Sequence, residues 1–362
     1  MIDEMILKND ERAVYRLRSL YRKYGYVPFK MSKFEEYELY VRNKDFLISD
    51  RIITFTDTNG KLLAMKPDVT LSIIKSRDDK RESKQKVYYN ENVYRVSGNT
   101  HQFKEIMQSG IECIGELDTY DIYEVVMLAG KSLCEISDSC VLDISHLGIL
   151  NALLSEAGGS DDFRREAAHF IAEKNTHDMI RSCKKYGIGE DVTEKIVTLI
   201  ETYGRPCDVL PALEDICTTD DAVSALNELH VLCELLSKTE IGKYVFIDFS
   251  IVGNLNYYNG IVFKGFVDGI CEGVLTGGQY DNLMHRMGRD SRAIGFAVYL
   301  DLLEGLSDSN CGNFVDVLIL YGENTTPGAV ASCVSECTSQ GLGVSVQKSI
   351  PEGLRYGKLL KL

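Results

Sequence analysis

A long stretch of helical periodicity, set between two groups of strand-like segments, constrains the fold of this chain more than any other feature. Residues 148–238 follow an almost purely helical pattern, interrupted only at short breaks that contain glycine. Strand-like runs lie before this stretch and return at residues 244–252. Since strands come both before and after the helices, we expect one sheet interrupted by a helical insertion at about 148–238. The sequence therefore predicts an α+β fold.

The strands before the insertion are predicted to pair with their neighbours in sequence. Residues 52–57 and 61–65 flank a turn containing Asn59-Gly60, and Asn-Gly supplies the positive backbone angles of a tight hairpin. Residues 86–96 and 103–114 are two further strand-like runs, joined by a polar loop, and suggest a second antiparallel pair. The spacing of apolar side chains also predicts amphipathic helices. These helices are expected at residues 11–24 and 120–135.

Beyond the insertion the pattern indicates more strands and then a separate unit. Two strands are expected at residues 257–265 and 273–276, with Asp268-Gly269 at the turn between them. The tail alternates strand, helix, strand and helix, which favours a small α/β unit with some parallel pairing. Its four elements are expected at residues 315–321, 327–339, 343–347 and 352–361. A polar break at 307–310 suggests two domains, at 1–306 and 313–362.

Charge and cysteine usage exclude several classes of function. The formal net charge of −14 gives no general attraction for polyanions, so nucleic acid is disfavoured as a partner. The eleven cysteines include no C-x-x-C pair and no ligand spacing with histidine, so neither a disulfide framework nor a metal site is expected. The N-terminus lacks a signal pattern, and no apolar run approaches the ~20 residues of a membrane span. A cytoplasmic protein without a cofactor is predicted.

One predicted strand carries two polar side chains that suit a small ligand. Gln108, Gly110 and Glu112 alternate along the run at 103–114 and therefore point to the same face. Gly110 leaves a gap between the amide and the carboxylate, and a strand glycine often marks close approach by another group. The alternative is an edge strand with an exposed glutamate.

Three other segments are weak signals when each is taken alone. Asp68 or Thr70 precedes a short helical run and could simply cap that helix. Tyr257 and Tyr258 begin a predicted strand, so one should face a pocket while the other packs. The glycines at 277–278 precede a helical run and allow close approach of the backbone to a ligand.

Taken in order, these segments resemble class II aminoacyl-tRNA synthetases and, among them, histidyl-tRNA synthetase, over nearly the whole chain. Residues 65–70 resemble the family's L-R-P-E-G-T segment, and residues 94–115 resemble its motif 2. Residues 255–263 resemble the histidine-specific motif, while 277–283 and 294–297 resemble G-G-R-Y-D-x-L and motif 3. The resemblance implies a class II synthetase-like antiparallel sheet flanked by helices, and the tail resembles the start of the anticodon-binding domain.

The resemblance also implies a histidine pocket. Its residues would be Asp68, Thr70, Gln108, Glu112, Tyr257, Tyr258 and Tyr280. The first three would meet the α-amino group, Glu112 and Tyr258 would hydrogen-bond the imidazole nitrogens, and Tyr280 would line the wall. Tyr257 would be the packed neighbour. Such a set suits histidine because an ammonium needs acceptors and imidazole needs a partner at each nitrogen.

The chain departs from the synthetases on the side where phosphate would bind. Gly253 stands in place of the catalytic arginine of the histidine-specific motif, and Leu302 in place of the arginine of motif 3. Loss of one such charge-stabilising donor typically costs on the order of 100 to 1000-fold in rate. Of the nucleotide clamp only Arg95 remains. Further replacements are Ser97, Gln102, Lys104 and Gln279. A retained ligand without the synthetase reaction is therefore predicted.

This pattern resembles the regulatory subunits of ATP phosphoribosyltransferase, bacterial paralogues of the synthetase in histidine biosynthesis. That resemblance implies a short-form catalytic chain as partner, a synthetase-like homodimer within a hetero-oligomer, and feedback inhibition by histidine. Two alternatives stay open. A divergent but active histidyl-tRNA synthetase would need a replacement cation, for which Arg286, Arg289 and Arg292 are candidates. A stand-alone histidine sensor or dimerisation module would act with some other partner.

Overall fold

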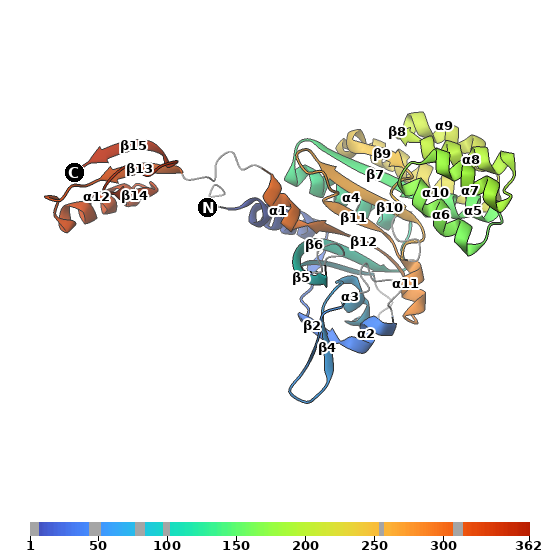
Figure 1. The fold of residues 1–362 in the computed structure, drawn as a ribbon, viewed down its shortest axis with the longest axis horizontal. Coiled ribbons are helices and arrows are strands. Elements are labelled where there is room, and N and C mark those ends of the chain that lie inside the picture. The colour runs from blue at the N-terminus through green and yellow to red at the C-terminus, as the bar shows by residue number, and fades with distance from the viewer. Residues whose placement is uncertain (1–6, 43–51, 77–83, 97–101, 253–256, 307–313) are drawn as a thin grey trace. The chain divides into compact units, whose positions relative to one another are not determined.

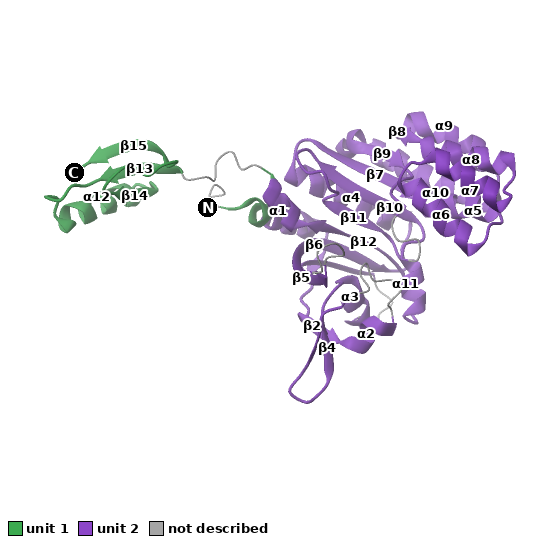
Figure 2. Cartoon of the chain, viewed as in Figure 1, with its two compact units in different colours: residues 1–12, 306–362 green, residues 13–305 purple. Residues whose placement is uncertain are grey.

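The computed structural model describes residues 7–42, 52–76, 84–96, 102–252, 257–306 and 314–362. Its internal contacts divide the chain into two compact units (Figure 2). The larger unit is Ala13–Gly305, and the smaller one combines Met1–Arg12 with Leu306–Leu362. Among the described residues, none of the helices combines the length and hydrophobicity that a membrane span requires. The described residues also hold no cluster of three or more potential metal ligands.

The larger unit is built on a mixed sheet (Figure 1). Nine strands of this sheet fall within the described residues, and neighbouring strands are antiparallel except in the β1–β5 and β7–β9 pairs. In spatial order they are β1 (Val27–Pro28), β5 (Gln85–Val96), β6 (Phe103–Gly115), β12 (Arg292–Tyr299), β11 (Leu275–Gln279), β10 (Ile261–Val267), β7 (Cys140–His146), β9 (Val245–Asp248) and β8 (Tyr203–Gly204). β5 and β6 form the predicted second antiparallel pair, from Gln85 opposite Ile114 to Val96 opposite Phe103.

The helical insertion lies between β7 and β9 in sequence. These two strands are nevertheless parallel neighbours in one sheet, with Asp143 opposite Phe246. The prediction of one sheet interrupted by a helical module is therefore confirmed. Figure 1 shows the helices gathered at one end of the larger unit. They are α5 (Leu147–Glu156), α6 (Asp161–Ala172), α7 (Thr176–Tyr186), α8 (Glu190–Glu201), α9 (Pro206–Ile216) and α10 (Asp220–Ser237).

Helix α4 (Thr119–Ile136) packs against β6, β7, β10 and β12 of the large sheet (Figure 1). Asp118 starts the helix, because its carboxylate accepts hydrogen bonds from the backbone N–H groups of Tyr120 and Asp121. Val125, Leu128 and Ala129 are fully buried and recur at helical spacing. Together with α1 (Asn9–Lys23), α4 confirms the two helices predicted on either side of the first strands.

A small antiparallel sheet contains the predicted Asn-Gly hairpin. Its order is β2 (Phe34–Glu36), β4 (Leu62–Met65) and β3 (Thr54–Thr56). Gly60 lies at the turn with φ of +81°, a conformation that favours glycine. The short helix α2 (Tyr37–Arg42) packs beside β2 and β4, and α3 (Thr70–Ser76) buries Ile73 and Ile74 in the core.

In the smaller unit, one of the four predicted elements is wrong. Strand β13 (Phe314–Leu320) lies between β14 (Val344–Gln347) and β15 (Arg355–Lys361), and both are parallel to it. With α12 (Pro327–Ser339), this confirms the first three predicted elements and the parallel pairing. The helix predicted at residues 352–361 is wrong, because residues 355–361 of that segment form β15. Gly353 and Gly357 disfavour a helix, and Gly357 lets the strand approach Asp316, whose carbonyl oxygen would lie 3.0 Å from an added Cβ.

Candidate functional site

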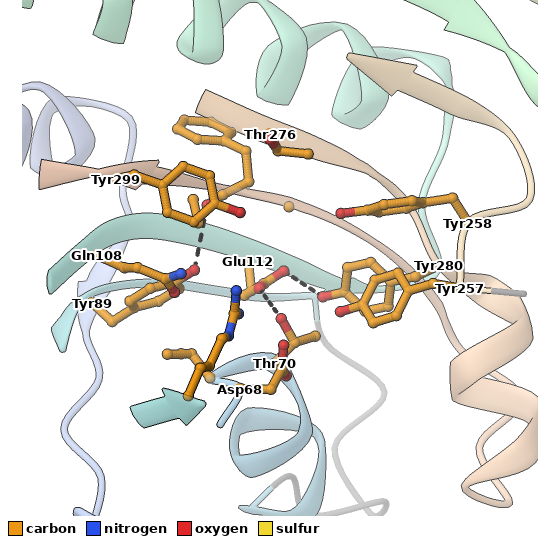
Figure 3. A pocket seen from close by; sticks show the side chains of 15 residues that line it. Asp68, Thr70, Tyr89, Gln108, Glu112, Tyr257, Tyr258, Thr276, Tyr280 and Tyr299 are labelled. Atoms are coloured by element: carbon orange, nitrogen blue, oxygen red, sulfur yellow. Dashed lines mark hydrogen bonds between the residues drawn. The ribbon is translucent and has the colours of Figure 1, made fainter. Parts of the chain in front are cut away.

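A cavity of about 310 Å³ is lined by residues of β5, β6, β11 and β12, by the segment that leads into α3, by residues just before β10, and by Tyr280 after β11 (Figure 3). Its size is at the lower end of the range found for small-molecule sites, roughly 300 to 1000 Å³. All seven residues that the resemblance assigns to a histidine pocket line it, together with Arg95. Those residues are Asp68, Thr70, Gln108, Glu112, Tyr257, Tyr258 and Tyr280. The fold thus brings together residues as far apart in sequence as Asp68 and Tyr280.

Glu112 is held from two sides within this cavity. The Thr70 hydroxyl donates to its Oε1 at 2.8 Å, and the Tyr280 hydroxyl donates to its Oε2 (Figure 3). Burial raises the pKa of Glu112 to about 8, although both hydroxyl donors oppose that shift. Its position depends on Gly295 of the neighbouring strand β12, where an added Cβ would lie 1.8 Å from Oε2. The carboxyl group is therefore fixed in one place.

Asp68 caps a helix and lines the cavity at once. Its Oδ1 accepts a hydrogen bond of 3.0 Å from the backbone N–H of Leu71, so the capping interpretation is correct for this residue. Burial raises the pKa of Asp68, while the N–H of Leu71 and the charge of Arg95 oppose the shift. Arg95 is itself positioned by donating from Nε to the carbonyl oxygen of Pro67 at 3.0 Å.

The two adjacent tyrosines both face the cavity, which corrects a prediction. The strand expected at 257–265 begins only at Ile261, so the alternation of strand side chains does not apply to Tyr257 and Tyr258. Their rings are 4.6 Å apart in an edge-to-face arrangement, and Tyr257 also lies 5.7 Å from the Tyr280 ring. Burial raises the pKa of all three hydroxyls well above the usual value, so they act as neutral hydrogen-bond donors and acceptors.

Gln108 and Glu112 point to the same face of β6, as predicted. The space beside Gly110, which was expected to admit a ligand, is occupied by the Tyr89 side chain. The Tyr89 hydroxyl lies 2.5 Å from where a Gly110 Cβ would be, and it donates to the carbonyl oxygen of Phe296 at 3.5 Å. Gly110 therefore makes room for Tyr89, which itself lines the cavity. The register that places Tyr89 opposite Gly110 is the signal that would have identified it.

Sequence reasoning gave no cavity role to several lining residues. These are Val69, Tyr89, Thr276, Gly295, Phe296, Ala297 and Tyr299. Gly295, Phe296 and Ala297 belong to the segment that resembles motif 3, and they form part of the cavity wall. Thr276 and Tyr299 come from the ends of β11 and β12.

The residues that stand in place of synthetase arginines and other phosphate-side residues lie in different parts of the fold. Leu302 lies half-buried in the short helix η4 (Leu300–Gly305) and does not line the cavity. Gln279 is buried outside the cavity lining, and its Oε1 accepts a hydrogen bond from the N–H of Ile261 at 2.6 Å. The replacement of the synthetase arginine by Gln279 therefore does not alter the cavity wall. Gln102 and Lys104 are exposed. The positions of Gly253 and Ser97 lie outside the described residues.

Among the described residues that line the cavity, Arg95 alone carries a positive charge. None of the three candidate replacement arginines belongs to the lining. Arg292 donates instead to Asp281 at 3.2 Å and to the carbonyl oxygen of Leu117 at 3.1 Å. Arg286 and Arg289 lie at and beyond the end of α11 (Asp281–Arg286). The cavity can therefore offer two carboxyl groups, an amide and several hydroxyls to a small ligand, with one guanidinium beside them.

Comparisons with known proteins point to one family. Residues 2–303 match the model of the family described as histidyl-tRNA synthetase. A protein of Oceanobacillus iheyensis named ATP phosphoribosyltransferase regulatory subunit is 26% identical over 324 residues, which cover 88% of this chain and 80% of that protein.

Solved structures share the fold. A crystal structure from Bacillus halodurans C, described as an ATP phosphoribosyltransferase regulatory subunit/histidyl-tRNA synthetase, superposes with a TM-score of 0.77 at 23% identity, covering 100% of this chain and 96% of that one. A chain of the ATP phosphoribosyl transferase (HisG:HisZ) complex from Thermotoga maritima has a TM-score of 0.65 at 20% identity, covering 83% and 97%. These structures confirm the class II synthetase-like fold.

Proposed function

Because this chain belongs to the histidyl-tRNA synthetase family, we propose that it has kept that family's amino-acid pocket and serves as a non-catalytic regulatory subunit of ATP phosphoribosyltransferase. One observation carries the proposal. The cavity gathers every described residue expected to recognise histidine, whereas Arg95 is the one positively charged side chain among its described lining residues.

The geometry supports histidine as the ligand. Thr70 and Tyr280 use their hydroxyl protons on Glu112, so their oxygen lone pairs remain available to accept from an ammonium or a ring N–H. Asp68 and Gln108 add a carboxylate and an amide oxygen for the α-amino group. Glu112 and the Tyr258 hydroxyl are then partners for the two imidazole nitrogens. This arrangement distinguishes histidine from other rings because each nitrogen meets a specific group.

The same geometry argues against amino-acid activation. Activation develops charge on the α-phosphate of ATP, and fixed cations in the site must stabilise that charge. Arg95 is tethered to Pro67, and Arg292 is engaged with Asp281 outside the lining. A regulatory role needs no such chemistry. It needs only that histidine binds two states of a complex with different affinity.

The names of the relatives support the proposed partner. The Oceanobacillus protein is named as a regulatory subunit of ATP phosphoribosyltransferase, and the Thermotoga chain was solved in a complex of that enzyme. We propose a catalytic chain of that enzyme as the partner. That this partner is the short form, and that the chain forms a homodimer within a hetero-oligomer, is what the resemblance to the regulatory subunits implies. Co-purification of the two chains in one complex is the expected result, and separate elution at micromolar concentrations would contradict it.

Calorimetric titration with histidine tests the pocket. The wild-type chain should bind, and Glu112→Gln or Tyr258→Phe should weaken binding about tenfold or more, because each removes a partner of a buried polar group. Tyr15→Phe is the matched control, since Tyr15 is 53% exposed on α1 and lies outside the cavity lining. Equal affinity in all four proteins would show that histidine binds elsewhere.

Histidine-dependent exchange of pyrophosphate into ATP tests the alternative. The purified chain should show no exchange above that of a no-protein control. Clear exchange that disappears in Arg95→Ala would establish a divergent synthetase and contradict the regulatory proposal.

A further inference from the structure

Two cysteines outside the cavity lie close enough to react with each other. The Sγ atoms of Cys134 and Cys140 are 3.9 Å apart. Cys134 belongs to the last turn of α4, and Cys140 is the first residue of β7. The intervening turn is held locally, because the Ser137 N–H donates to the carbonyl oxygen of Leu133 at 2.9 Å and the Ser139 N–H donates to Ser137 Oγ at 3.2 Å. A short turn therefore keeps the two sulfurs together.

The surroundings make the two thiols unequal. Cys134 is partly exposed, whereas Cys140 is only 8% exposed. The Cys140 thiol, the positive charge of Lys243 and the Tyr244 hydroxyl lower the pKa of Cys134 against the effect of burial. The Cys134 interaction and burial raise the pKa of Cys140. Since the thiolate is the nucleophile, Cys134 is the thiol that attacks first. Cys140 is placed to attack the mixed disulfide that then forms on Cys134.

We propose that Cys134 and Cys140 form a reversible intramolecular disulfide by exchange with an oxidised low-molecular-weight disulfide. The Cys134 thiolate attacks one sulfur of that disulfide, forms a mixed disulfide and expels one small thiolate. Cys140 loses its proton to solvent and attacks Cys134 Sγ, which forms the internal bond and expels the second small thiolate. Two electrons pass to the small disulfide, which becomes two thiols. This inference is independent of the proposed function.

The geometry permits the bond with a small local movement. The sulfur atoms must approach from 3.9 Å to about 2.05 Å. Helix ends fray more readily than helix interiors, and Cys134 lies two residues before the end of α4. Cys333 and Cys337 provide a contrast, since they lie four residues apart within α12. Helical positions at that spacing have Cβ atoms roughly 5 to 6 Å apart, beyond the roughly 4.5 Å of a disulfide.

Oxidation of the full chain with glutathione disulfide, followed by alkylation and tryptic mass spectrometry, tests the proposal. Trypsin should release residues 132–164, which contain Cys134 and Cys140 and no other cysteine. We expect this peptide unalkylated and lighter by two hydrogen atoms, and restored by dithiothreitol. Cys140→Ser should instead carry a glutathione adduct on Cys134. In Cys134→Ser, Cys140 should remain a free thiol.

The exposed Cys271 serves as an internal control for reagent access. Full alkylation of Cys134 and Cys140 under conditions in which Cys271 carries glutathione would overturn the proposal. A cross-link between Cys333 and Cys337 with Cys134 and Cys140 still reduced would overturn it as well, because it would show that proximity in the folded chain does not select the pair.

Discussion

At the scale of single residues, the protonation of Glu112 should make the free energy of unfolding depend on pH. The pKa of Glu112 is about 8 in the folded protein against 4.5 for an unperturbed carboxyl group. Between these values the folded state holds a proton that the unfolded state has released. The free energy of unfolding should therefore fall as pH rises from about 4.5 to 8, and become level above that range. Asp143, whose pKa burial and the neighbouring Asp248 raise to about 7, acts in the same direction.

Glu112→Gln should make this dependence weaker. The amide cannot ionise, so the melting temperature of the variant should fall less than that of the wild type between about pH 5 and 8. A residual slope should remain because Asp143 is intact. Glu116→Gln is the matched control, since Glu116 is an exposed glutamate just after β6. Parallel melting curves for wild type and Glu112→Gln across this range would contradict the account of a buried, protonated carboxyl group.

Which cavity residues can be predicted from sequence depends on the local backbone. Gln108 and Glu112 were predictable because they lie inside a regular strand, where alternation holds. Tyr257 was assigned to packing because that argument was applied to residues that precede the strand. Tyr89 was missed because its place depends on the register between β5 and β6, which sequence alternation alone does not define.

At the scale of elements, glycine positions can be compared directly within the insertion. Gly187 ends α7 in the left-handed region, with φ of +72°, whereas Gly189 precedes α8 with φ of −62°. Nothing lies within 4 Å of an added Cβ at either position, so the two sites differ in backbone conformation and not in space.

Gly187→Ala should therefore lower the free energy of unfolding by about 1 kcal/mol, because an L side chain is strained in the left-handed region. Gly189→Ser should leave stability unchanged or raise it slightly, since serine can accept the free N–H groups at the start of α8. Urea denaturation followed by circular dichroism measures both. Equal loss in the two variants would indicate that the insertion is destabilised by any added side chain.

The elements predicted well share strong local signals. The glycine breaks, the Asn-Gly hairpin and the long amphipathic helices all depend on residues near each other in sequence. The segment at 352–361 was misassigned because its side chains fit a helical period, while its actual structure depends on β13, which begins about forty residues earlier. Long-range strand pairing of this kind leaves little trace in a local pattern.

At the scale of the whole molecule, we propose two domains, residues 1–306 and 313–362, with the insertion at about 148–238 inside the first. A chain ending at Leu306 should fold and bind histidine as tightly as the full chain, because the described lining residues all lie between positions 68 and 299. Leu306 must be kept, since its carbonyl oxygen accepts from Asn9 at 3.0 Å. Loss of histidine binding by soluble, folded truncated protein would show that the tail completes the site.

The fold class and the family follow from the order of segments along the chain, and so they were accessible from sequence. The partner cannot be predicted in the same way, because a surface that contacts another chain has no periodic pattern in the sequence. The proposal of a catalytic partner therefore depends on the loss of phosphate-side cations and on the relatives, and it requires a direct assay.

The most direct test of the regulatory role is an activity assay of a short-form ATP phosphoribosyltransferase catalytic chain. The activity is measured with and without this protein, and each mixture is titrated with histidine. We expect the catalytic chain to become active, or much more active, when this protein is added, and histidine to suppress that activity. Glu112→Gln should preserve the activation while shifting inhibition to higher histidine concentrations. Activity that does not change at any ratio of the two chains would contradict the account.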